Sequence, residues 1–247
     1  MKKLLVLIAC TCWSLSSMAQ ATTDSTPKFH FGVKLSPCLS WFRSDKNTAD
    51  NTPESDGSLL RASYGFVADI RFSKNYFFST GVNVNYQGGK LKRTLSDQFG
   101  NPDTNRTSTW EQDLRLRYIE LPLTLRMQTN EIGYIKYYFQ AGIAPSINIR
   151  ARYDASETIS LPDYPGVNNT ENEYSEEDVS DDINLFNIGM LVGGGISYNL
   201  SGTTDMLIGL TFHNGFLDIT DKKAENPVLK NSKLTSNLLT LDVGILF

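Results

Sequence analysis

Apolar and polar residues alternate along much of the chain, most clearly in its last ten residues. Within residues 238–247 one parity is apolar and comprises Leu239, Leu241, Val243, Ile245 and Phe247. Successive side chains of a strand point to opposite faces, so this pattern predicts a strand with one apolar and one largely polar wall. In water such an apolar edge would be prone to aggregate. In a closed membrane barrel the apolar wall would face lipid and both edges would be paired.

Seven further segments alternate in the same way, at residues 28–42, 60–72, 76–92, 113–127, 134–150, 186–200 and 205–216. The connections between the eight segments are alternately long and short. We therefore predict an all-β fold, an eight-stranded antiparallel transmembrane β-barrel over residues 28–247, with short periplasmic turns and long extracellular loops. A soluble eight-stranded barrel would have the opposite walls, apolar inside and polar outside.

The alternation changes phase within residues 113–127. Leu114, Leu116 and Tyr118 share one parity, whereas Ile119 and the apolar residues that follow take the other. One extra residue in the strand would produce such a change, so we predict a β-bulge near 118–120, next to Pro122.

Aromatic residues lie near both ends of the predicted strands. At the turn end they are Phe72, Tyr76, Tyr137, Tyr198 and Phe247, and towards the loop end they are Trp41, Tyr64, Tyr86, Phe186 and Phe212. Two aromatic levels that bound an aliphatic band are typical of the two interfaces of a bilayer. This arrangement favours the membrane barrel over the soluble one.

Charged residues occupy the parity predicted to face the lumen. They are Lys34, Arg61, Asp69, Arg71, Glu120, Arg126, Lys136, Arg150 and Asp242. Eight strands enclose an interior just wide enough for side chains to fill it. Because buried charges must be paired, we expect a plug of ion pairs and hydrogen bonds rather than a conducting pore.

The N-terminal residues have the features of a secretory signal peptide: Lys2 and Lys3, an apolar middle, and Ser17 and Ala19 as small residues. We expect a signal peptide at 1–19 and a short periplasmic lead at 20–27. A lipoprotein box ending at Cys10 is the alternative. Removal of the signal peptide would leave 21 of the 23 basic residues against 27 acidic ones, a net charge of −6. No basic stripe indicates nucleic acid as a partner.

Bulk composition fits a barrel and not a helical membrane protein. The chain has 247 residues, 40% of them hydrophobic, and a mean hydropathy of −0.27. A helical span would need about 20 consecutive apolar residues, whereas alternation dilutes hydropathy in a strand. Cys38 would be the single cysteine after cleavage, which excludes a disulfide framework.

Residues 153–182 form the longest predicted loop and carry ten acidic residues and no lysine or arginine. We expect this loop to be mobile and extracellular. It is a solvated surface loop, a docking surface for a basic partner, or a Ca²⁺ site, although its spacing matches no known cation loop. The candidate docking residues are Glu171, Glu173, Glu176, Glu177, Asp178, Asp181 and Asp182.

No residue pattern indicates catalysis, a cofactor or a metal. The two histidines, His30 and His213, have no cysteine or carboxylate at metal-ligand spacing. Some small outer-membrane barrels are lipid-modifying hydrolases, but no nucleophile has an obvious place beside His213. The run Gly193-Gly-Gly195 lacks the following helix of a phosphate cradle, so we interpret it as relief for close packing.

The segment Tyr118-Ile-Glu-Leu-Pro-Leu-Thr-Leu-Arg126 resembles a motif of the PorT-like outer-membrane barrels of Bacteroidota. Phe31-Gly-Val-Lys34 and Tyr138-Phe-Gln-Ala-Gly142 are similar to that family's first and fifth strands. The terminal Phe247 resembles the signal that the barrel-assembly machinery reads.

The resemblance implies an integral outer-membrane protein with both termini in the periplasm and no catalytic residues. Because PorT is associated with type IX secretion, it also implies an accessory role in protein export, with outer-membrane lipid and a secretion protein as partners and no small-molecule substrate. A structural or surface-adhesion barrel with a surface protein as its partner is the alternative, and a lipid-modifying enzyme is a second one.

Overall fold

The computed structural model describes residues 28–45, 52–98, 105–160 and 170–247, and these residues form an antiparallel β-structure. The predicted signal peptide and periplasmic lead lie outside the described residues. The strands are β1 (Phe29–Ser44), β2 (Glu54–Ser73), β3 (Tyr76–Gln98), β4 (Asn105–Glu120), β5 (Leu123–Gln128), β6 (Ile135–Ser160), β7 (Thr170–Asp178), β8 (Phe186–Ser201), β9 (Thr204–Gly215) and β10 (Leu234–Leu246). A 3₁₀ turn, η2 (Ser180–Asp182), follows β7. No helix in these ranges is long and apolar enough to cross a membrane.

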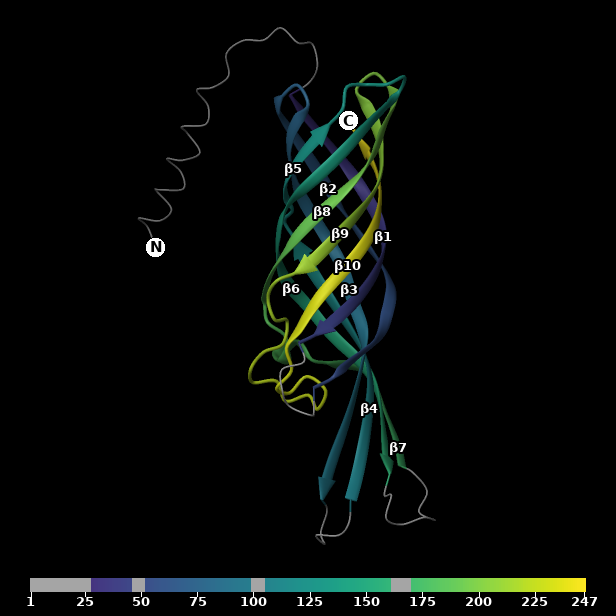
Figure 1. Cartoon of the computed structure of the whole chain (residues 1–247), viewed down its shortest axis with the longest axis vertical. Coiled ribbons are helices and arrows are strands. Elements are labelled where there is room, and N and C mark those ends of the chain that lie inside the picture. Colours follow the sequence, from purple (N-terminus) through teal and green to yellow (C-terminus); the bar gives the residue numbers. More distant parts are fainter. Residues whose placement is uncertain (1–27, 46–51, 99–104, 161–169) are drawn as a thin grey trace, which may run out of the picture.

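The strands close into a ring, which confirms the predicted barrel (Figure 1). The first and last strands are paired, with Leu39 opposite Leu239. Phe247 donates a backbone hydrogen bond to Phe31 at 2.7 Å and accepts one from it at 3.2 Å. β4 and β5 together form one strand of the barrel wall, because their common register with β3 is unbroken across Pro122. We call each such full-length strand of the wall a stave. The ring therefore has eight staves, and β7 lies outside it, paired with β6.

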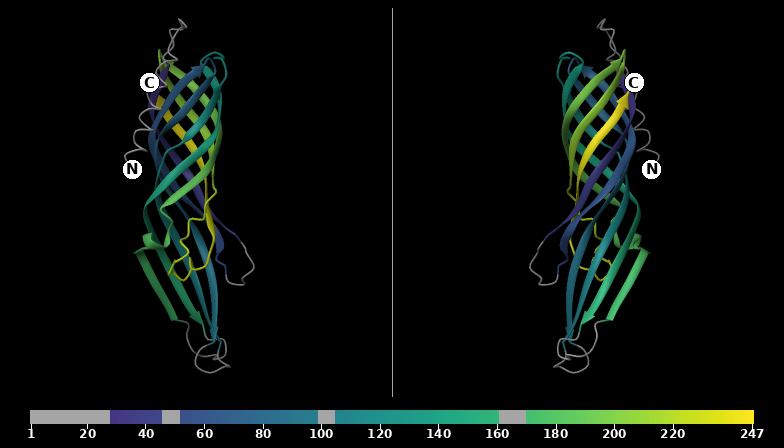
Figure 2. Two further views of the ribbon diagram at one scale, coloured as in Figure 1. Left: turned by 90° about the vertical axis from the view of Figure 1, so that its left-hand side faces the viewer. Right: turned by 90° about the vertical axis from the view of Figure 1, so that its right-hand side faces the viewer.

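The two ends of the barrel differ. Short turns and the C-terminus lie at one end, whereas β3, β4, β6 and β7 continue well past the other end (Figures 1 and 2). We call this protruding part of β3, β4, β6 and β7 the outer sheet. Residues 93–112 and 153–182 were expected to be loops, but 93–98, 105–112, 153–160 and 170–178 are strands. The buried face of these segments carries polar residues such as Gln112 and Glu157 as well as Trp110 and Ala155, so their sequences lack the apolar alternation that reveals a membrane strand.

The predicted phase change on β4 is real, but its predicted cause is wrong. The register of β4 with β3 runs without a shift through Tyr118, Ile119 and Glu120. Leu114, Leu116 and Tyr118 are buried inside, whereas Ile119 and the residues of its parity are exposed outside. The apolar parity switches because the surroundings switch. The outer wall meets lipid on the turn side of Ile119 and water on the loop side. The bulge lies in the neighbouring β6, where Arg117 is opposite Arg150 and Tyr118 is opposite Asn148.

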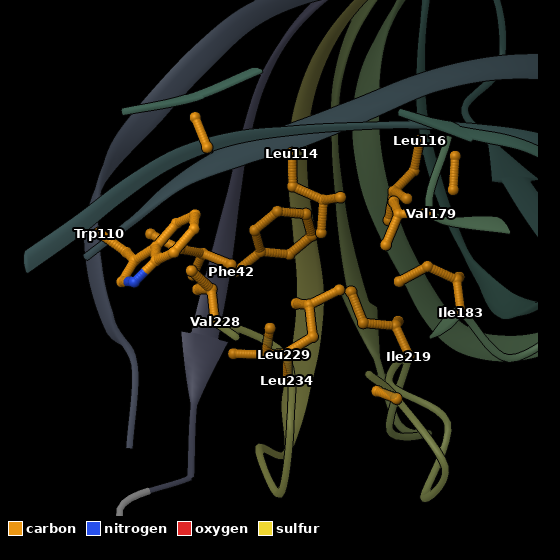
Figure 3. Packing of buried hydrophobic residues seen from close by; sticks show 14 of the residues in the cluster. Phe42, Trp110, Leu114, Leu116, Val179, Ile183, Ile219, Val228, Leu229 and Leu234 are labelled. Atoms are coloured by element: carbon orange, nitrogen blue, oxygen red, sulfur yellow. The ribbon is translucent and has the colours of Figure 1, made fainter. Parts of the chain in front are cut away.

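An apolar core fills the outer mouth of the barrel (Figure 3). Its buried residues are Phe42, Leu91, Trp110, Leu114, Leu116, Tyr118, Ala151, Ala155, Val179, Ile183, Ile219, Ala224, Val228, Leu229 and Leu234. Residues 216–233, which connect β9 to β10, contribute several of them, and we call this segment the cap. The sequence pattern predicted a plain loop here, because the apolar residues of the cap follow no strand or helix period.

Buried polar groups hold the cap in place. Arg93 Nη1 donates to the backbone carbonyls of Pro227, Val228 and Lys230 at 2.9, 3.1 and 2.7 Å. The Asp182 carboxylate accepts the backbone N–H groups of Glu225 and Asn226 at 2.9 and 3.0 Å. Charge-assisted hydrogen bonds of this kind are stronger than neutral ones, so the connection folds as a fixed cover.

Candidate functional site

The middle of the lumen is crossed by an ion pair between Arg126 and Asp69, both almost fully buried. Arg126 also donates to Gln140 Oε1 from Nε at 3.3 Å and from Nη2 at 3.1 Å, and its guanidinium lies 4.9 Å from the ring centroid of Tyr138. A Cβ on Gly209 would come within 2.1 Å of the Tyr138 hydroxyl. Gly209 therefore provides the space that the Tyr138 ring occupies.

A second lumen group is centred on Asp242 of the closing strand. Its carboxylate accepts hydrogen bonds from Ser36 at 2.6 Å and Thr211 at 2.5 Å, and Lys34 Nζ lies at 3.7 Å. Strands β1, β9 and β10 are thereby joined through their inner faces as well as their edges. This network stabilises the closure of the barrel, because a buried carboxylate needs such partners.

A third group contains Glu120 and His213. Asn83 Nδ2 donates to Glu120 Oε1 at 3.2 Å, and His213 Nδ1 lies 3.6 Å from Glu120 Oε2. The neighbouring cavity measures about 20 Å³, which is room for about one water. Among the described residues His213 is 8% exposed, and the space beside it admits about one water-sized molecule.

Towards the turn end, Lys136 Nζ lies 3.1 Å from Asp205 Oδ2, to which Ser197 also donates at 3.0 Å. Arg71 lies over the ring of Phe77, 5.5 Å from its centroid. The other lumen cavities measure about 30 and 40 Å³. With the apolar core above them, these groups leave no channel through the part of the barrel that the structure describes.

The predicted lumen residues fall into two sets. Lys34, Asp69, Arg71, Glu120, Arg126, Lys136 and Asp242 lie in the groups just described. Arg61 is half-buried at the outer rim. Arg150 is exposed on the outside of the wall, which corrects its predicted position. The bulge in β6 at Ile149 is the reason, because one extra residue reverses the parity of every later side chain.

The predicted girdle residues lie on the outer wall, several of them in ring pairs. At the turn end, Phe72 lies near Tyr76, Phe247 near Phe31 and Tyr198 near Tyr134, with ring centroids 5.9–6.3 Å apart. At the loop end, Trp41 is stacked with Phe212 at 6.2 Å, and Tyr64 lies 6.3 Å from Tyr86. Tyr137 and Phe186 are exposed on the same wall.

The acidic candidates do not form one mobile loop. Asp182 holds the cap, and Glu176 Oε2 lies 2.7 Å from Arg152 Nη1. The Ser180 N–H, 2.8 Å from Asp178 Oδ1, holds the pKa of the Asp178 carboxyl below its usual range. The remaining candidates are exposed on or just after β7, namely Glu171, Glu173, Glu177 and Asp181. No group of three or more potential ligands for a metal ion occurs within the described ranges.

Comparison with known structures returns bacterial outer-membrane proteins. Neisserial surface protein A shares 14% identity over 90% of this chain and 98% of its own, with a TM-score of 0.42. The attachment invasion locus protein Ail of Yersinia pestis shares 11% over 90% and 100%, with a TM-score of 0.34. The outer membrane protease OmpT of Escherichia coli shares 8% over 94% and 99%, with a TM-score of 0.37. Curated proteins give no significant match.

A family model identifies the chain. Residues 18–221 match the model described as "Outer membrane protein beta-barrel domain". This span includes most of the strands of the ring and the outer sheet. The match confirms the predicted location in the outer membrane, where the exposed apolar wall lies in lipid. The chain belongs to the outer membrane protein β-barrel domain family.

Proposed function

We propose that the protein is a non-enzymatic outer-membrane barrel that conducts no solute and presents its outer sheet to a protein partner outside the cell. The observation that supports this function most is the contrast between a filled interior and a protruding sheet. Four polar groups and the apolar core occupy the lumen, whereas β3, β4, β6 and β7 extend beyond it (Figure 2). Within the described ranges His213 is the histidine that lies beside a carboxylate, and it is buried next to a cavity of about 20 Å³.

The free edge of β7 indicates the chemistry of the partner. Within the described residues β7 pairs with β6 alone, so its other edge presents unpaired backbone groups. An extended segment can add to such an edge through main-chain hydrogen bonds. Glu171, Glu173 and Glu177 are exposed on this strand. Charge complementarity favours a basic extended segment.

Two peptides test this docking on protein held in lipid nanodiscs, one alternating Lys and Val and the other alternating Glu and Val. We expect the basic peptide to bind and to be released by 0.5 M salt, where the Debye length is well below ~8 Å. The variant E171Q/E173Q should bind several-fold more weakly, whereas the control E131Q/E225Q, with the same change in charge, should bind as wild type. Equal binding of both peptides, or equal binding by all three proteins, would refute the docking proposal.

The absence of conduction has its own test in planar lipid bilayers. We expect no reproducible channel steps from the folded protein, because the lumen groups and the cap block the path. Reproducible conductance steps that decrease as the permeating ion becomes larger would show that the barrel is a pore.

An accessory role in export is the second candidate function. It rests on the resemblance of segment 118–126 to PorT-like barrels. In the structure Tyr118, Glu120 and Arg126 of this segment are buried inside. The motif therefore reflects packing inside the barrel. It supports a resemblance to PorT-like barrels more than it supports a role in protein export. Deletion of the gene followed by an assay of proteins secreted across the outer membrane decides the matter, and unchanged secretion would exclude the role.

A further inference from the structure

The outer wall of the barrel has a notch between β2 and β3. Their pairing is interrupted between Ser58 and Ser63, with a register shift. There β3 bends towards β1: the Ser40 hydroxyl donates to the Gly88 carbonyl at 2.7 Å, and the Gly88 N–H donates back at 2.8 Å. A Cβ on Gly89 would come within 2.7 Å of the Phe42 ring, so this approach requires glycine. The bend leaves a hollow of about 180 Å³.

Arginines surround this hollow, and we call them the rim arginines: Arg61, Arg115, Arg117, Arg150 and Arg152. Arg115 of β4 lies directly opposite Arg152 of β6, and Arg117 lies directly opposite Arg150. Like charges directly opposite each other on one face destabilise a sheet. The β4–β6 sheet contains two such pairs in adjacent rows, and Arg61 lies across the notch from them. Added negative charge would reduce the repulsion among these five guanidinium groups.

Two of the rim arginines have carboxylate partners. Arg115 pairs with Asp154, and Arg152 lies 2.7 Å from Glu176. The N–H of Glu176 in turn donates to Asp154 Oδ1 at 2.7 Å, and Glu176 takes a left-handed φ of 53°. This bulge in β7 turns its carboxylate towards the arginines, yet it neutralises only part of their charge.

The other three rim arginines have no carboxylate within 4 Å among the described residues. Arg117 lies over the Tyr86 ring, 4.6 Å from its centroid. The Nε groups of Arg61, Arg117 and Arg152 are buried with no hydrogen-bond acceptor in the part of the chain that the structure describes. Nearby Asp113 lies 3.7 Å from Lys90, and Asp178 accepts from Ser180. Buried donors without acceptors are costly, so these groups are arranged for an oxygen-rich anion.

The height of the rim arginines identifies where that anion comes from. Ile119, Ile147 and Ile149 are exposed on the same two strands, directly towards the membrane. Arg117 is two residues from Ile119, or roughly 7 Å along the strand. The rings of Tyr64 and Tyr86 lie 6.3 Å apart beside the notch, at the outer aromatic level. The rim arginines thus face the level of lipid headgroups, just above the apolar wall.

We propose that the rim arginines bind the phosphate of a phosphorylated glycolipid in the outer leaflet, whose acyl chains lie along the apolar wall below. Planar guanidinium groups bind phosphate through paired N–H···O bonds, which makes arginine better suited than lysine to this task. The lipid phosphate supplies the negative counter-charge that Arg61, Arg117 and Arg150 lack. It also relieves the repulsion between the arginines of β4 and those of β6. This inference is independent of the docking of a peptide at β7.

The first arm of the test needs no variant. Wild-type protein in detergent micelles is mixed with lipid A that carries its phosphates, or with chemically dephosphorylated lipid A, and bound lipid is measured by native mass spectrometry. We expect at least a tenfold preference for the phosphorylated form. Equal retention of the two lipids would overturn the proposal.

The second arm compares R117Q/R150Q with R43Q/K233Q, which loses the same charge elsewhere at the loop end. Folding is checked by heat-dependent migration in gels. We expect R117Q/R150Q to lose at least tenfold in affinity for phosphorylated lipid A, and R43Q/K233Q to stay within twofold of wild type. If R117Q/R150Q does not fold, R117K/R150K keeps the charge without the fork and should lose affinity to a smaller extent. Wild-type affinity in whichever of the two variants folds would overturn the proposal.

The third arm separates a lipid from soluble anions. Inorganic phosphate and heparin are used as competitors for phosphorylated lipid A. We expect each to compete only at concentrations at least a hundredfold above the lipid's own dissociation constant, because neither has acyl chains for the apolar wall. Competition by either at equal concentration would assign the site to a soluble anion and overturn the lipid assignment.

Discussion

The membrane-embedded barrel and the outer sheet are built with opposite polarity from the same strands. On the turn side of Ile119 the inner wall carries Glu120 and Arg126, and the outer wall is apolar. On the loop side of Ile119 the inner wall carries Leu114 and Leu116, and the outer wall carries Arg115 and Arg117. The outer wall is apolar where it meets lipid and polar where it meets water. The inner wall is polar where it contacts the lumen groups and apolar where it contacts the apolar core. Strand β4 therefore changes its apolar face without changing its register.

The two regions also gain stability in different ways. The embedded part transfers its outer apolar side chains from water into lipid as the barrel folds, because a chain with unpaired backbone groups does not stay in the hydrocarbon region, and it pairs its charges inside. The outer part depends on apolar burial away from water, as soluble domains do. Mutations of the same kind should therefore have different effects on either side of Ile119.

Removal of one charge from the lumen should have the largest effect. Asp69→Ala leaves Arg126 without its buried counter-charge, so we expect the free energy of unfolding to fall by about 3–5 kcal/mol. Equilibrium unfolding in lipid vesicles measures this. The double variant D69L/R126M should recover most of the loss, since it leaves no unpaired charge. A double variant no more stable than D69A would show that the ion pair is not the cause.

Truncation of an apolar side chain should cost more in the outer core than on the lipid wall. Leu114 is fully buried, and Leu114→Ala should lower the free energy of unfolding by about 2–5 kcal/mol through the cavity it creates. Leu125→Ala, on the lipid wall of the same stave, should cost clearly less, because lipid chains fill the space. Equal losses in the same unfolding assay would remove the distinction between the two regions.

Arginine on the outer wall should be tolerated only above the membrane. Val82 is 47% exposed on the lipid wall, and Val82→Arg should cost about 2–4 kcal/mol if it lies near the midplane. Thr94→Arg, on the same strand and parity but in the outer sheet, should cost almost nothing. Urea titrations of both variants in vesicles give the comparison. A V82R variant as stable as T94R would contradict the assigned lipid wall.

The orientation of the barrel has a test without a change in stability. Protease added to intact cells should cut within residues 153–182 and leave two fragments that stay associated. Mass spectrometry of the fragments identifies the site. If cleavage occurs only after the outer membrane is opened, the outer sheet lies in the periplasm.

The sequence was sufficient for the embedded part of the fold. Lipid outside and polar partners inside force strict alternation, so the eight staves, the short turns and the inward position of residues such as Asp69 and Asp242 could be predicted. The same rule failed where water replaces lipid. Residues 105–112 and 170–178 alternate too weakly to indicate strands, and the parity switch at Tyr118 has the same sequence pattern as a bulge.

The rim arginines show what a single sequence leaves out. Arg115-Leu-Arg117 and Arg150-Ala-Arg152 are visible as paired arginines with a period of two. Their meeting depends on the register of β4 with β6 and on the extra residue Ile149, neither of which follows from composition or periodicity. The cap is similar, because Arg93 and Asp182 reach it from segments that are remote in sequence.

The reversal of polarity along β4 is tested most directly by spin labels at single cysteines in a Cys38→Ala background. Labels replace Arg115, Leu116, Ile119 and Leu125 in turn, and their collision rates with oxygen, which concentrates in lipid, and with a water-soluble nickel complex are compared in bilayers. We predict that oxygen dominates at positions 119 and 125, that the nickel complex dominates at 115, and that 116 is shielded from both. High oxygen collision at both 116 and 119 would place a bulge between them, with both side chains on the lipid wall, and contradict the reversal.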